Sequence, residues 1–183
     1  VSFNDGAAQA DIIILAGPVS VIIQQIHQLT EIPLKNNVLV TDVGSTKREV
    51  MAAAKKLTAK GVDFVGGHPM AGSHLAGSRF GSADLFAAAS YFLCGNFKDN
   101  PELERFKKLL GPGRVKWVEI TAADHDKLVA EISHVPHVAA ACLAKSVSDQ
   151  LLDNPTGLKS AAGGFRDTTR IAASDPTMWT TIL

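Results

Sequence analysis

The sequence predicts an α/β protein in which a partial Rossmann-type parallel sheet is followed by an all-helical domain. As far as Ile120, short apolar runs alternate with helical patterns, which is typical of βαβ units and a mostly parallel sheet. After Ile120 no strand pattern occurs, and apolar residues recur at helical spacing. The 183 residues are 46% hydrophobic, which is enough for the cores of two small domains. We place these domains at residues 1–120 and 121–183.

Five segments have the composition of β-strands. The first, DIIILA at 11–16, is a continuous apolar run, and we expect it to be buried on both faces of the sheet. The others follow at 37–42, 62–67, 90–95 and 114–120.

Helix signals lie between these runs. Pro18 suits the first turn of a helix, and Ser45 or Thr46 can cap the next one, which Gly61 can end. The predicted helices cover 18–30, 47–57 and 101–111. The helical domain then opens at Thr121, which together with Asp124 resembles a capping box.

Composition and charge exclude several classes of protein. The formal net charge is zero, which argues against a nucleic-acid-binding surface. The longest apolar run, at 12–23, is too short to span a membrane and is interrupted by Gly17 and Pro18, and the first residues do not resemble a signal peptide. Cys94 and Cys142 lie far apart, which suggests reduced thiols in a cytoplasmic protein. No CxxC or HExxH spacing predicts a metal site.

The segment GGHPMAGSH (66–74) contains the first candidate functional residue. Ligand sites of open α/β sheets lie at the carboxyl ends of the strands, so the loops AGPV, DVGST and GGHPMAGSH should line one crevice. There His68 is well placed as a general base, since imidazole titrates near neutral pH. The alternative is a loop histidine that only caps the strand.

The segment ISHVPHV (132–138) forms a second candidate. In a helix Ser133 and His137 share a face, whereas His134 points elsewhere. Pro136 should free a backbone carbonyl and kink the helix, leaving a polar notch. The alternative is an ordinary junction between helices with surface histidines.

The segment GGFRDTTRIAASDPTMW (163–179) forms a third candidate. Arg166 and Arg170 are four residues apart, on one face of a predicted helix. Two guanidinium groups on one face suit a substrate with carboxylates. The alternative is a solvated face with i, i+4 charge pairs.

Together these motifs resemble the prephenate/arogenate dehydrogenase family of tyrosine biosynthesis. The resemblance runs from about Asp11 to the last residue and rests on DIIILAGPV, VTDVGSTK, FVGGHPMAGSH, ISHVPH and AAGGFRDTTRIAASDPTMW, in the order of the family. It implies a Rossmann-like dinucleotide-binding domain and a helical substrate and dimerisation domain. It also implies an NAD-dependent oxidative decarboxylation of prephenate to 4-hydroxyphenylpyruvate, with NADP not excluded, in a homodimer.

The resemblance also implies roles for individual residues. His68 would draw the proton of the substrate's C4 hydroxyl, and Ser45 would lie beside that hydroxyl and the nicotinamide. Arg170 would pair with the ring carboxylate, and Arg166 would add positive potential. The expected catalytic residues are His68 and Ser45. The expected substrate-binding residues are Ser73, Ser133, His137, Arg166, Arg170 and Trp179. The expected cofactor-binding residues are Gly17, Pro18, Asp42, Gly44 and Ser45.

The main departure from the family pattern is that the sequence contains no GxGxxG motif. The resemblance therefore implies that the first domain is incomplete at its N-terminus and the second at its C-terminus. Three alternatives follow: an arogenate (cyclohexadienyl) dehydrogenase, a non-catalytic fragment of such an enzyme, or a 3-hydroxyacid dehydrogenase. The last class typically has a lysine and an asparagine where ISHVPH has histidines.

Overall fold

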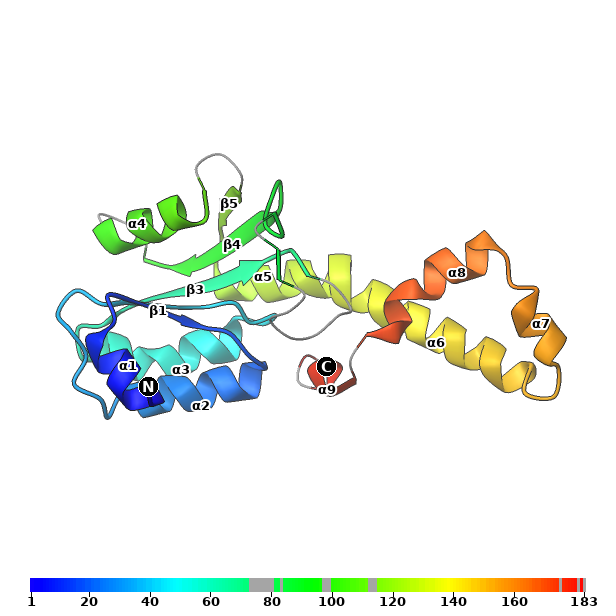
Figure 1. Cartoon of the computed structure of the whole chain (residues 1–183), viewed down its shortest axis with the longest axis horizontal. Helices are drawn as coiled ribbons and strands as arrows, with labels where there is room; N and C mark the ends of the chain where they lie inside the picture. Colours follow the sequence, from blue (N-terminus) through cyan, green and yellow to red (C-terminus); the bar gives the residue numbers. More distant parts are fainter. Residues whose placement is uncertain are drawn as a thin grey trace.

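The computed structural model describes residues 1–72, 81–82, 84–96, 100–111, 115–174, 176–180 and 182. In these residues a five-stranded sheet with helices on its faces is followed by a region that contains only helices (Figure 1). The predicted fold class is therefore confirmed. The change from sheet to helices falls between Glu119 and Ala122.

The strands lie in the sheet in sequence order. They are β1 (Ile12–Leu15), β2 (Leu39–Asp42), β3 (Asp63–Pro69), β4 (Ser90–Gly95) and β5 (Lys116–Glu119). β1, β2 and β3 are parallel to one another, whereas β4 pairs with β3 antiparallel and with β5 in parallel. The carboxyl ends of the first three strands therefore meet at one edge, where a ligand site is expected.

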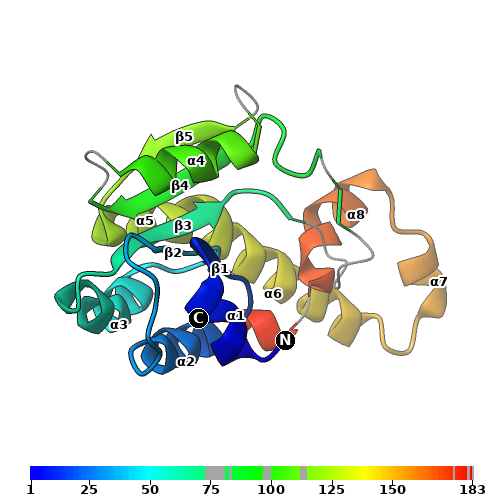
Figure 2. The same ribbon diagram turned by 60° about the vertical axis from the view of Figure 1, so that its left-hand side comes forward.

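Helices cover the sheet in two layers, as Figure 2 shows. The helices of this part are α1 (Phe3–Gln9), α2 (Val19–Leu29), α3 (Arg48–Ala59) and α4 (Pro101–Leu109). α1, α2 and α3 pack on one face of the sheet, and α4 packs on the other. Helix α1 was not predicted from the sequence. Ser2 caps it by accepting a hydrogen bond from the Asp5 N–H.

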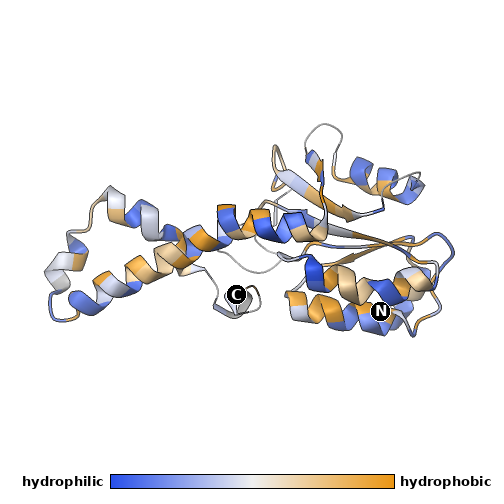
Figure 3. Cartoon of the chain, turned by 180° about the vertical axis from the view of Figure 1, so that it is seen from behind, coloured by the Kyte–Doolittle hydropathy of each residue, from blue (hydrophilic) through white to orange (hydrophobic). Residues whose placement is uncertain are grey.

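The helical region extends from the sheet as an arm (Figure 1). It contains α5 (Ala122–Val129), a π-helical turn (Ala130–His134), α6 (Val135–Gln150), α7 (Pro155–Lys159), α8 (Gly163–Thr169), a 3₁₀ turn (Arg170–Ala173) and α9 (Pro176–Trp179). Thr121 is confirmed as the N-cap of α5, because its hydroxyl accepts a hydrogen bond from the Asp124 N–H and donates one to the Asp124 carboxylate. Figure 3 shows apolar residues along much of α6.

The irregularity near Pro136 differs from the expected kink. Pro136 lies in the first turn of α6, but the residues before it are also helical, so the helix continues through this point. The backbone instead widens one turn earlier, and Val135 donates to the carbonyl oxygen of Ala130. The helix therefore contains a π turn just before Pro136, and π turns are frequent at functional sites.

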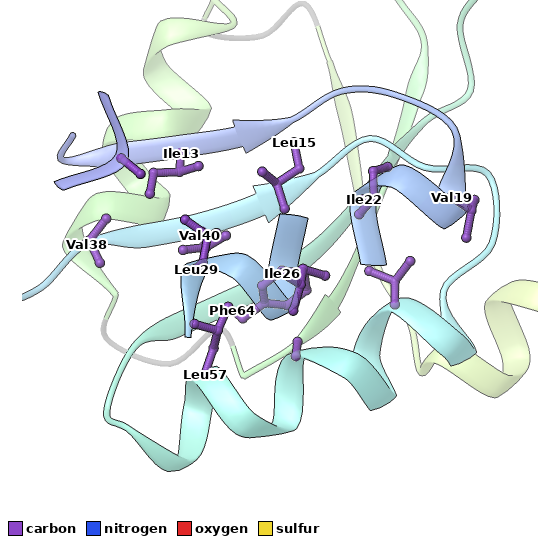
Figure 4. Packing of buried hydrophobic residues seen from close by; sticks show 13 residues of the cluster. Ile13, Leu15, Val19, Ile22, Ile26, Leu29, Val38, Val40, Leu57 and Phe64 are labelled. Atoms are coloured by element: carbon purple, nitrogen blue, oxygen red, sulfur yellow. The ribbon is translucent and has the colours of Figure 1, made fainter. Parts of the chain in front are cut away.

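The main core lies between β1–β3 and the layer of α1, α2 and α3 (Figure 4). Alternate strand residues point into it, such as Ile13 and Leu15 of β1, and they meet Ile22 and Ile26 of α2. The expectation that β1 is buried on both faces is wrong. β1 is an edge strand of the sheet, and 49% of Ile14 is exposed on its other face.

Among the residues that the structure describes, no helix is both long enough and apolar enough to cross a membrane.

Candidate active site

The loops after β1 and β2 form a pocket of about 300 Å³ at the carboxyl edge of the sheet. It is lined by Gly17, Pro18, Val19, Val43, Gly44, Ser45 and Ile182. Four of the five residues predicted to bind a cofactor thus line one cavity. Ile182 reaches it from the segment that follows α9, so residues far apart in sequence meet there.

The fifth predicted residue, Asp42, does not line this pocket, because its side chain is fully buried. Its carboxylate accepts hydrogen bonds from the N–H groups of Gly44 (2.8 Å) and Gly67 (3.1 Å), and it pairs with the ammonium of Lys47. Burial raises the pKa of the Asp42 carboxyl, although the Lys47 ammonium and the two N–H donors act against this. Asp42 therefore ties the loop that carries Ser45 to the strand that carries His68.

The two glycines before His68 have a packing reason. A Cβ on Gly67 would lie 2.4 Å from the carbonyl oxygen of Asp42, closer than real Cβ atoms come to such an atom. A Cβ on Gly66 would lie 2.8 Å from the sulfur of Met51 and 3.2 Å from Cδ of Lys47. Glycine at these positions lets the end of β3 approach β2 and α3 closely.

His68 lies near the end of β3 and is half-buried. Its Nδ1 is 2.9 Å from Nε2 of His125, and its ring lies near that of Phe92. Burial lowers the pKa of His68 to about 3, with smaller contributions in the same direction from Lys47, His125 and His134, which Asp126 opposes. The ring is therefore neutral near pH 7, as a general base must be.

His125 and Asp126, at the start of the helical region, complete a chain of hydrogen bonds to His68. Nδ1 of His125 is 2.7 Å from Oδ1 of Asp126. A carboxylate accepts, so His125 carries its proton on Nδ1 and accepts on Nε2. Neutral His68 then donates from Nδ1, and the lone pair on its Nε2 is left as the basic site. The chain orients His68 as an aspartate orients the histidine of a catalytic triad.

Asp126 is held in turn by the N-terminus of α3. Its two carboxylate oxygens accept hydrogen bonds from the N–H groups of Lys47 (2.7 Å) and Arg48 (2.9 Å). The expectation that Ser45 or Thr46 caps α3 is therefore wrong, because a carboxylate from α5 satisfies these donors. These hydrogen bonds and the interaction with His125 lower the pKa of Asp126 against the opposing effect of burial, so it stays ionised near pH 7.

The roles of His125 and Asp126 were not predicted from the sequence. The only local signal was the run DHD at 124–126, whose residues read as a solvated first turn of a helix. Their contacts join positions 57 and 79 residues apart along the chain, which spacing rules for single helices do not cover.

In the helical region the structure brings together His137, Trp179 and His134. The rings of His137 and Trp179 are stacked with centroids 3.5 Å apart, and His134 meets Trp179 edge-on at 5.7 Å. The expectation that His134 points away from His137 is wrong, because both rings face the indole of Trp179. Ser133 is half-buried. Burial lowers the pKa of both histidines.

Arg166 and Arg170 are exposed, and neither forms an ion pair with any residue in the described ranges. Arg166 belongs to α8, and Arg170 begins the 3₁₀ turn that packs on α6. No contact joins these arginines to His68 in that part of the chain, and both guanidinium groups are open to a ligand. Ser73 lies outside the described residues.

The sheet topology and the pocket at the ends of β1 and β2 define a nucleotide-binding α/β protein of the Rossmann type, with a helical region attached. Residues 2–119 match the family model described as "Prephenate dehydrogenase, nucleotide-binding domain". Residues 121–183 match "Prephenate dehydrogenase, dimerization domain". The chain therefore belongs to the prephenate dehydrogenase family.

Similarity to individual proteins supports this assignment. The chain is 41% identical to the prephenate dehydrogenase of Lactococcus lactis subsp. cremoris (strain MG1363), covering 100% of this chain and 50% of that protein. It is 39% identical to the prephenate dehydrogenase of Bacillus subtilis (strain 168), covering 100% and 49%. A crystal structure of prephenate dehydrogenase from A. aeolicus with hydroxyphenyl propionate and NAD+ matches with a TM-score of 0.78 and 30% identity. That match covers 98% of this chain and 61% of the other. The chain spans about half the length of its curated relatives.

Proposed function

We propose that this chain is part of an enzyme that oxidises and decarboxylates prephenate to 4-hydroxyphenylpyruvate with NAD. The observation that carries the proposal is the chain His68–His125–Asp126, which leaves Nε2 of a neutral imidazole as a base. This base lies on the strand next to the loop that lines the pocket, and Asp42 joins the two. The family assignment supplies the reaction.

The pocket at the ends of β1 and β2 fits one end of a dinucleotide. Its walls include Gly17 and Gly44, which have no side chains, and Pro18 and Ser45. A Cβ on Gly44 would lie 2.9 Å from Oδ2 of Asp42, so the loop can take this close path only with glycine. NAD bound there would accept the hydride from C4 of the substrate. Asp42 would contribute indirectly, by fixing Gly44.

His68 would act as the base on the substrate. As the C4–H electron pair leaves, Nε2 of His68 takes the proton of the C4 hydroxyl. Loss of the ring carboxylate as CO₂ supplies the electron pair that makes the ring aromatic, and the imidazolium returns its proton to the C4 oxygen. The reaction therefore consumes no net proton, and Asp126 stabilises the transient positive charge through His125.

The helical residues would bind the rest of the substrate. Arg170 is the partner of the ring carboxylate, and Arg166 adds positive potential for a dianion. Trp179 closes the pocket against His137, and its buried Nε1–H has no hydrogen-bond partner within the described part of the chain. Ser45, Ser73 and Ser133 would offer hydroxyl groups to the substrate.

The second domain would also form a homodimer. Exposed apolar side chains are spread over α6 and its neighbours, at Ile132, Val135, Val138, Leu143, Leu152 and Leu158. A helical arm with this much exposed apolar surface requires a partner, and a second copy fits the description of the matching family model. Light scattering on the full-length protein should give twice the mass of one chain; the mass of one chain would exclude the dimer.

The function is tested by mixing the full-length protein with prephenate and NAD and following the absorbance of NADH. We expect turnover with prephenate and much less with arogenate, because the arogenate side chain carries an ammonium group and no carboxylate lines the pocket among the described residues. Turnover with arogenate alone would make the protein an arogenate dehydrogenase. No turnover with either substrate would refute the proposed function.

A further inference from the structure

Lys47 is fully buried, which is rare for a lysine. Its ammonium group pairs with Asp42, and its aliphatic chain passes the backbone of Gly66, where even a Cβ would lie only 3.2 Å from Cδ. The same carboxylate of Asp42 accepts from Gly44 and from Gly67. The ammonium of Lys47 thus completes a buried cluster around the Asp42 carboxylate. This cluster includes Gly44, which precedes Ser45, and Gly67, which precedes His68.

The backbone of Lys47 takes part in a second connection to the same site. Its N–H donates to Asp126, which orients His125, and His125 contacts His68. Lys47 is therefore connected to His68 in two ways. One connection runs through Asp42 and Gly67, and the other runs through Asp126 and His125 of α5. Lys47 is the residue at which the two connections meet.

Resting on the proposed function, we propose that Lys47 is a positioning residue that holds Ser45 and His68 in register and keeps the His68 base correctly oriented. Because its side chain is fully buried, it would touch neither substrate nor cofactor. A buried charge pair is a poor way to gain stability, because desolvation offsets the attraction, so a role in geometry explains its presence better.

Electrostatics support the same role. The charged and titratable groups that act on His68 are Lys47 from α3, His125 and Asp126 from α5, and His134 from the π turn. The Lys47 ammonium lowers the pKa of His68, whereas Asp126 raises it. Removing the Lys47 charge should therefore raise the pKa of His68, an effect that a loss of stability alone would not produce.

The test compares three variants of the full-length protein. Lys47→Met alone leaves the Asp42 carboxylate buried without a counter-charge, so it is expected to unfold readily. Lys47→Met combined with Asp42→Asn removes both charges, while the amide retains an oxygen for one of the two N–H donors, and this variant should fold. Lys55→Met, on the exposed side of α3, is the matched control.

Two measurements decide the outcome. In NMR titrations of ¹⁵N-labelled histidine, the wild-type His68 ring should hold its proton on Nδ1 and stay neutral down to about pH 3. The double variant should titrate at higher pH and lose the preference for one tautomer. With prephenate and NAD, its kcat should fall by roughly 100-fold, with the acid limb of its pH profile moved upward, as expected for a misplaced base.

A folded double variant with wild-type kcat and an unchanged His68 titration would overturn the inference, since the pair would then be structural only. Absence of turnover in the wild-type protein would instead refute the proposed function. In that case the NMR titration still tests Lys47, because it reads the state of His68 without any reaction.

Discussion

Replacing His68 with asparagine should lower kcat by about 10²–10⁴-fold, the usual contribution of a general base. Asparagine keeps an amide N–H close to the position of Nδ1, so the hydrogen bond to Nε2 of His125 and the local fold should survive. The variant lacks the lone pair that corresponds to Nε2 of His68, so nothing takes the hydroxyl proton. Steady-state rates of NADH formation with saturating prephenate measure the effect.

The matched control for this variant is His27→Asn. His27 is exposed on α2, away from the carboxyl edge of the sheet, and its substitution should leave kcat unchanged. If His68→Asn turned over prephenate as fast as this control, the hydrogen-bond chain would orient a histidine that takes no part in the chemistry.

Replacing Gly67 with alanine should destabilise the protein by about 3 kcal/mol, at the upper end of the range for overpacking. The added methyl group would lie 2.4 Å from the carbonyl oxygen of Asp42, a backbone atom that cannot move aside alone, and 3.0–3.1 Å from the side chains of Tyr91 and Thr41. The strands β2 and β3 would have to separate, which would weaken the hydrogen bond from Gly67 to Asp42. Urea unfolding followed by circular dichroism gives the change in free energy of unfolding.

Gly6→Ala provides the comparison. Gly6 lies in α1, and a Cβ there would meet nothing within 4 Å, so alanine should stabilise the helix slightly. Equal unfolding midpoints for Gly67→Ala and the wild-type protein would show that β2 and β3 do not need the close contact that the structure assigns to Gly67.

Features that depend on local chemistry could be predicted from the sequence. Apolar runs bounded by turn residues located the strands, and Thr121 with Asp124 marked the start of the helical region. The carboxyl ends of β1 and β2 could be placed at one pocket because parallel strands leave a sheet on the same edge. The direction of β4 could not be predicted, because an apolar run carries no information about which way a strand lies.

Features that depend on tertiary contacts were missed. In the sequence, Asp42 is a polar residue at the end of a strand. In the fold, its carboxylate accepts hydrogen bonds from the N–H groups of Gly44 and Gly67 and pairs with the ammonium of Lys47. Ser45 looked like a helix cap, but the carboxylate of Asp126 takes that place. Which group forms each of these hydrogen bonds depends on which elements pack together, and a local sequence pattern does not contain this information.

In the proposed reaction, oxidation and decarboxylation occur together on prephenate. The most direct test supplies the full-length protein with NAD and prephenate labelled in its ring carboxylate, and measures labelled CO₂ and NADH from the same reaction. We expect equal molar amounts of the two. NADH without CO₂ would indicate a simple oxidation of the hydroxyl group, and CO₂ without NADH would indicate aromatisation by loss of water. Either result would refute the proposed reaction.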